Sequence, residues 1–140
     1  MDDVQTSVGR CFRHTLPSRL HAVDECCRLT EIHLSECGLS THAFSVLLLM
    51  REALNNAVLH GNGIDSDRVV RVRVYCGKRW ITLHVEDEGE GFDWKTGLGR
   101  VGGETDTDGR GLALYRLYAE KILFNARGNS VVLWLSRKEE

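Results

Sequence analysis

The sequence predicts an α+β fold, in the form of a two-layer α/β sandwich with a mixed, mostly antiparallel sheet and helices on one face. Two long helical segments come early in the 140-residue chain, and two pairs of short alternating strands follow them. A third helix lies between the strand pairs, and no internal repeat divides the chain. Strands joined in pairs and separated from helices are typical of α+β architecture. A single domain is therefore expected over residues 1–140.

The N-terminal part of the chain predicts an edge strand followed by a helix. Residues 11–16 fit a short edge strand, and Pro17 begins a turn or a helix. Apolar side chains then recur over residues 19–36 with the period of an amphipathic helix. Gly38 is expected to end this helix.

A second helix is predicted over residues 43–60, and it is apolar over most of its circumference. A helix of this kind is largely buried. Ser40 or Thr41 fits its N-cap, and the turn at residues 61–63 ends it.

Alternation of apolar and polar residues predicts the strands. Residues 69–75 and residues 80–85 both alternate with period two, and residues 76–79 suit the hairpin between them. A loop rich in Gly, Thr and Asp follows at residues 94–108. The remaining expected elements are a helix at residues 112–119 and strands at residues 122–125 and 130–135.

Charge and composition exclude several classes of protein. The 18 basic and 20 acidic residues give a net charge of −2, which excludes a strongly basic nucleic-acid binder. Apolar runs such as residues 46–50 are far too short to span a membrane. The five cysteines form no C-x-x-C pair, so we expect free thiols and neither a disulfide framework nor a zinc site. A cytoplasmic protein without direct nucleic-acid or membrane contact is predicted.

Three segments carry residues suited to chemistry. Glu52, Asn56 and His60 are spaced i, i+4, i+8 and share one face of the second helix. If this face lines a cavity, the Asn56 carbonyl oxygen suits Mg²⁺, and Glu52 suits proton abstraction from a hydroxyl or water. The alternative is a helix whose polar stripe merely faces solvent.

The second segment, residues 87–93, follows a strand and alternates acids with glycines. Gly89 and Gly91 allow the backbone to approach a flat ligand, and the Asp87 carboxylate can accept a hydrogen bond from an exocyclic amine. The alternative is an acidic turn. The third segment, residues 108–112, opens a helix with glycines around Arg110, which suits a phosphate. The alternative there is an ordinary flexible helix start.

Together and in this order, the three segments resemble the motifs of the GHKL (histidine kinase-like) ATPases. Residues 52–61 (EALNNAVLHG) are similar to the N box, residues 87–93 to the G1 box and residues 109–112 (GRGL) to the G2 box. The resemblance covers residues 17–136. Within the superfamily, the E-x-x-x-N-A-x-x-H-G pattern is similar to that of the anti-sigma-factor serine kinases.

The resemblance implies an ATP–Mg²⁺ site in an α/β sandwich, closed by a lid loop at residues 94–108. It implies that Glu52 is the catalytic base, Asn56 the Mg²⁺ ligand and Asp87 the adenine contact, with His60 in support. The other implied nucleotide-binding residues are Gly89, Gly91, Gly109, Arg110, Gly111, Leu112 and Ser130.

The function implied by the resemblance is that of an ATP-dependent serine/threonine protein kinase, often a homodimer. Such a kinase sequesters a sigma factor and phosphorylates a STAS-type anti-anti-sigma antagonist, which releases the antagonist. Two alternatives stay open: a switch kinase acting on a phosphatase-activating pathway, and a nucleotide-gated binding module with little kinase activity. A sensor histidine kinase is not expected, because 140 residues leave no room for a helical phosphoacceptor domain.

Overall fold

A computed structural model of the chain describes residues 10–63, 65, 67–91 and 107–137. The described elements follow one another in the order β1 (Arg10–Pro17), α2 (Leu20–Glu36), η1 (Ser40–His42), α3 (Ala43–Asn56), η2 (Ala57–Gly61), β2 (Val69–Cys76), β3 (Trp80–Glu86), α5 (Thr107–Tyr118), β4 (Lys121–Phe124) and β5 (Ser130–Ser136). No helix in the described ranges is both long and apolar enough to cross a bilayer.

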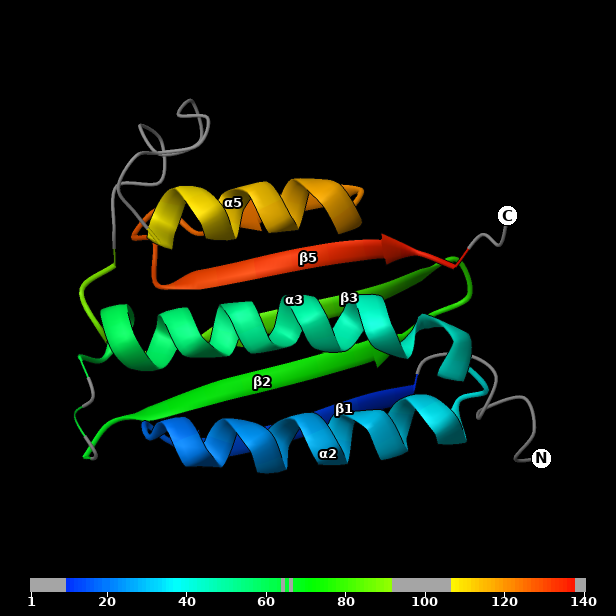
Figure 1. Cartoon of the computed structure of the whole chain (residues 1–140), viewed down its shortest axis with the longest axis horizontal. Coiled ribbons are helices and arrows are strands. Elements are labelled where there is room, and N and C mark those ends of the chain that lie inside the picture. Colours follow the sequence, from blue (N-terminus) through cyan, green and yellow to red (C-terminus); the bar gives the residue numbers. More distant parts are fainter. Residues whose placement is uncertain (1–9, 64, 66, 92–106, 138–140) are drawn as a thin grey trace.

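The strands form one five-stranded sheet in the order β1-β2-β3-β5-β4. Each pairing between these described strands is antiparallel, where the sequence led us to expect a mixed sheet. Helices α2, α3 and α5 all cover the same face of the sheet (Figure 1). The predicted α+β class and the two-layer arrangement are therefore confirmed.

The core lies between the helices and the sheet. On β2, Val70, Val72 and Val74 are buried, while Arg71 and Arg73 are exposed on the other face. Full burial of a large aliphatic side chain stabilises the fold by about 1.5–3 kcal/mol. The largest fully buried aliphatic side chains come from both layers: Leu16, Leu34, Leu49, Met50, Leu54, Ile81, Leu83 and Leu133.

Strand boundaries agree with the sequence alternation to within one residue at each end. The helix expected at residues 112–119 instead begins at Thr107. The last two residues of the loop expected at residues 94–108 therefore belong to α5. Glycines with low helix propensity occupy this start, which explains why the sequence places it too late. The rest of that expected loop lies within residues 92–106, outside the described part of the chain.

The second predicted helix does not stay α-helical up to residue 60. It is regular from Ala43 to Asn56 and then widens into a π-helical turn, η2, over Ala57–Gly61. The Asn62 amide donates to the Ala57 carbonyl oxygen at 2.7 Å, which is the i to i+5 bond of a π-helix. Single π-turns of this kind occur frequently at functional sites. Here the turn brings Gly61 to the end of β3.

Candidate functional site

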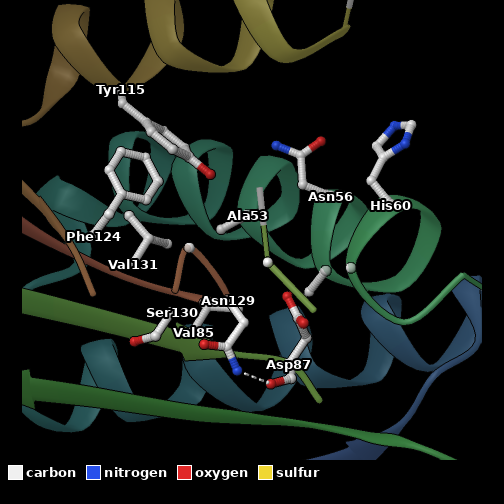
Figure 2. Close-up of a pocket in the computed structure, with 14 residues that line it drawn as sticks. Ala53, Asn56, His60, Val85, Asp87, Tyr115, Phe124, Asn129, Ser130 and Val131 are labelled. Carbon is white, nitrogen blue, oxygen red and sulfur yellow. Dashed lines mark hydrogen bonds between the residues drawn. The ribbon is translucent and has the colours of Figure 1, made fainter. Parts of the chain in front are cut away.

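A pocket opens at one end of the sheet, between the end of α3, η2, α5 and the strands β3, β4 and β5 (Figure 2). Side chains from five separate segments converge on it. The lining residues are Ala53, Asn56, Ala57, His60, Gly61, Val85, Asp87, Gly91, Tyr115, Phe124, Gly128, Asn129, Ser130 and Val131. Val85, Phe124 and Val131 make one wall of the pocket apolar. The polar side chains of Asn56, His60 and Asp87 lie across from this wall, on α3, on η2 and after the end of β3.

Asp87 is the buried acid of this pocket. It comes directly after β3, and only 8% of its surface is exposed. The Gly89 amide donates to its Oδ1 at 2.7 Å, and no other described residue donates to the carboxylate. Burial raises the pKa of Asp87, and the Gly89 bond opposes this rise without cancelling it. The carboxylate thus keeps acceptor capacity for a donor placed in the pocket.

The backbone of Asp87 is fixed by Asn129, in the turn between β4 and β5. The Asp87 amide donates to the Asn129 carbonyl oxygen at 2.9 Å, and Asn129 Nδ2 donates to the Asp87 carbonyl oxygen at 2.7 Å. Asn125 holds the same turn, because its Oδ1 accepts from the Gly128 amide at 2.7 Å. The sequence indicated only a turn here, since nothing local shows that Asn129 reaches a strand 42 residues away.

Two glycines allow η2 to touch the Asp87 carboxylate. A Cβ atom on Gly61 would overlap that carboxylate, and a Cβ atom on Gly89 would overlap the Gly61 carbonyl oxygen. Gly91 has a φ of +91°, and a Cβ atom there would overlap the Arg127 carbonyl oxygen. The sequence singled out Gly89 and Gly91. Gly61 was expected only to end the helix, as the last residue of the motif that begins at Glu52, and its contact with Asp87 was not predicted.

Asn62 joins the end of η2 to the sheet. Only 3% of its surface is exposed. Its Nδ2 donates to the Val69 carbonyl oxygen at 3.0 Å, and its Oδ1 accepts from the Glu88 amide at 2.8 Å. The Glu88 carboxylate accepts in turn from the Val69 amide at 3.0 Å. The sequence indicated Asn62 only as part of a helix-ending turn, because its partners Val69 and Glu88 lie in other segments.

The polar face of the second predicted helix turns partly toward the pocket. Asn56 and His60 line it on the side opposite Asp87 (Figure 2). Glu52 lies one turn earlier on the same face and is half-buried, but it is not among the lining residues. Asn56 is half-buried and His60 exposed, so this face does not carry the desolvation cost of a fully buried polar stripe.

Ser130 lines the pocket, but its hydroxyl is engaged elsewhere. The neighbouring Val131 faces the core, so alternation along β5 directs the Ser130 side chain to the outer face of the sheet. There its Oγ lies 2.8 Å from His84 Nε2. Burial lowers the pKa of His84, and Arg73 lowers it further. The hydroxyl therefore does not face the pocket as a free polar group.

The remaining predicted site residues, Gly109, Arg110, Gly111 and Leu112, lie in the first turns of α5. This helix contributes buried Tyr115 to the pocket. The expectation that a glycine-rich segment opens a helix is confirmed for the backbone, and the phosphate-binding roles of these four residues stay predictions.

We predict that Gly89→Ala destabilises the fold more than Gly63→Ala does. A Cβ atom on Gly89 would overlap the backbone of Gly61. The added methyl group must therefore displace η2 from the end of β3, which lowers the free energy of unfolding by more than about 3 kcal/mol. Gly63 has a φ of +69° and open space around it, so its variant bears only conformational strain of about 1–2 kcal/mol. Urea unfolding of both variants measures the difference. Equal losses would contradict the close packing described here.

We also predict that Asp87→Asn is at least as stable as the wild type at pH 7 when no ligand is present. Because the folded-state pKa of Asp87 is raised, ionisation of this carboxylate costs stability as the pH rises through that pKa. Asparagine keeps an oxygen for the Gly89 amide and has no charge to bury. The advantage of the variant should shrink as the pH falls toward about 4, the pKa of an unfolded aspartate. A variant that is less stable at pH 7, by an amount independent of pH, would contradict the assignment.

The comparison of the sequence with known families agrees with this geometry. The chain matches the histidine kinase-like ATPase domain over residues 16–135. The matched range contains all the pocket residues, every element from α2 to β4 and most of β5, and it begins near the end of β1. No curated protein sequence gives a significant match. Because the family match spans most of the chain, the protein belongs to the histidine kinase-like ATPase domain family.

Proposed function

We propose that the protein is an ATP–Mg²⁺-dependent serine/threonine protein kinase of the anti-sigma type. In this proposal it sequesters a sigma factor and phosphorylates a STAS-type antagonist of that sequestration. The observation that carries the nucleotide part is the buried Asp87 carboxylate, which faces an apolar pocket and has acceptor capacity to spare. The protein partners rest on the resemblance of the helix motif at residues 52–61.

The pocket fits an adenine ring. Val85, Phe124 and Val131 form an apolar wall suited to a flat heterocycle. The Asp87 carboxylate then accepts a hydrogen bond from the exocyclic amine. A buried carboxylate paired with such a donor discriminates strongly, because a ligand without the amine leaves the acid unpaired. Gly91 also lines the pocket, and its lack of a Cβ atom lets its backbone lie against the Arg127 carbonyl oxygen.

The phosphates would extend toward α3 and the start of α5. The Asn56 amide lines the pocket and offers the oxygen donor that Mg²⁺ prefers. Mg²⁺ would supply charge neutralisation on the phosphates. Helix α5 begins at the same end of the molecule as the pocket (Figure 1), and a helix N-terminus with free amides suits an anion. These positions support phosphate contacts by Gly109, Arg110, Gly111 and Leu112.

Glu52 is the proposed general base. It lies one helical turn from Asn56 on the same face, outside the adenine-lining set, where an acceptor protein can reach it. Glu52 would take the proton of the acceptor serine or threonine hydroxyl as that oxygen bonds to the γ-phosphorus. The bond from the γ-phosphorus to the bridging oxygen breaks, and ADP leaves. General-base catalysis of this kind contributes about 10²–10⁴-fold to a rate.

We predict that Asn56→Ala loses most of the Mg²⁺-dependent part of ATP affinity, by at least tenfold. The matched control is Asn55→Ala, because Asn55 is the neighbouring amide on α3, is also half-buried and does not line the pocket. Calorimetric titration of both variants with ATP, with and without Mg²⁺, measures the effect. If the two variants bind alike, Asn56 is not the metal ligand.

The kinase activity is tested by incubating the protein and Mg-ATP with a panel of bacterial STAS-domain proteins. We expect one phosphate on a serine or threonine of the cognate member, detected by intact-mass spectrometry. Glu52→Gln should bind ATP normally and transfer at least 100-fold more slowly, in line with the loss of a general base. A wild-type rate in Glu52→Gln would remove it as the base. ATP binding without transfer to any member would favour the nucleotide-gated binding module.

A further inference from the structure

Three potential metal ligands from distant segments meet at the end of the sheet opposite the pocket. His33 lies in the last turn of α2, Cys37 directly follows that helix, and Cys76 is the last residue of β2. Cys76 pairs with Ile81 near the start of β3, whereas Asp87 follows the end of β3. The length of a strand therefore separates this cluster from the candidate nucleotide site, and nothing in the proposed function uses it.

The ligand atoms already have the spacing of a metal site. His33 Nε2 lies 3.4 Å from Cys76 Sγ and 3.8 Å from Cys37 Sγ. All three atoms lie within 4.8 Å of one another. Around a tetrahedral Zn²⁺, the bond lengths place a nitrogen and a sulfur ligand about 3.6 Å apart and two sulfur ligands about 3.8 Å apart. A cation could thus be bound with small side-chain movements.

The surroundings hold these ligands in place. Cys76 and His33 are buried, with 4% and 8% of their surfaces exposed, and Cys37 is half-buried. The Phe12 ring stacks on the His33 ring, with centroids 5.5 Å apart. Burial lowers the pKa of His33, which favours the neutral imidazole that ligates metals. The cluster therefore combines a fixed ring with one thiol that can be reached from solvent.

The surroundings of Cys76 keep its free thiol protonated, and two nearby arginines act against this only in part. Burial raises the pKa of Cys76 to about 12, and the neighbouring Cys37 raises it too, so the free thiol stays protonated at neutral pH. Arg137 and Arg10 act in the opposite direction and would favour the charged form. Cation binding displaces the thiol proton, so metal uptake here is coupled to proton release.

We propose that His33, Cys37 and Cys76 form a Zn²⁺ site with its fourth position open to water. Two sulfurs and one imidazole suit a borderline-soft cation and disfavour Mg²⁺ or Ca²⁺, which take oxygen ligands. On binding, the two thiols become thiolates, their protons pass to solvent, and no electron transfer is needed. The bound cation would link the end of α2 to the end of β2.

The test titrates Zn²⁺ into the reduced, metal-free full chain in competition with a chromophoric chelator. We expect uptake of one equivalent, with proton release, and a thiolate-to-metal charge-transfer band when Co²⁺ replaces Zn²⁺. Cys37→Ser should weaken binding at least tenfold. Cys11→Ser is the control, because Cys11 is an exposed thiol on β1 and is not part of the cluster. It should bind Zn²⁺ as the wild type does.

Cys37→Ser is the primary variant because Cys37 is half-buried at the margin of the core, whereas Cys76→Ser alters a buried position within the core. The proposal is overturned if the folded, reduced wild type takes up no Zn²⁺, or if Cys37→Ser binds as tightly as Cys11→Ser. It is also overturned if air oxidation joins Cys37 to Cys76 while the reduced protein binds no metal. ATP affinity should be the same in Cys37→Ser, so this test is independent of the proposed nucleotide function.

Discussion

The site depends on the contact between the backbone of Gly61 and the carboxylate of Asp87. This contact requires a residue without a Cβ atom at Gly61, and Gly89 must also lack one to let the Gly61 carbonyl approach. The π-helical turn η2 places Gly61 there, at the end of a helix that is otherwise regular. A helix end and a strand end are thereby locked against each other, with an acid between them. This close approach is possible because side chains are absent at these two positions.

Hydrogen bonds from two asparagines keep that contact in register. Asn62 joins the end of η2 to the start of β2 and to the segment after β3, and Asn129 holds the main chain of Asp87. The carboxylate is consequently held in a buried place that raises its pKa. A charge in such a position costs stability in the free protein, and a donor in a bound ligand would compensate for it. Functional sites are commonly less stable locally than the rest of a fold in this way.

Much of the fold could be predicted from the sequence, because the strands bury one face and their alternation is therefore regular. The start of α5 could not, since glycines near Gly109 have low helix propensity and tertiary context decides their conformation. The π-turn and the roles of Gly61, Asn62 and Asn129 depend on segments that lie far apart in the chain.

The candidate site was predictable to a similar degree. Asp87 and Asn56 were identified from their motifs and line the pocket, whereas the hydroxyl of Ser130 bonds to His84 on the other face of the sheet. The cluster at His33 was missed because its thiols lack paired spacing in the sequence. Cys37 and Cys76 come together only when α2 packs beside the end of β2.

The most direct measurement is a calorimetric titration of Mg-ATP into the wild type beside Asp87→Asn. If the Asp87 carboxylate accepts a hydrogen bond from the exocyclic amine of adenine, the wild type binds Mg-ATP and the variant binds it at least tenfold more weakly. This loss is expected because a hydrogen bond to a charged group is worth about 1.5–3 kcal/mol. Equal affinity in a folded Asp87→Asn, or no binding by the folded wild type, would contradict the account.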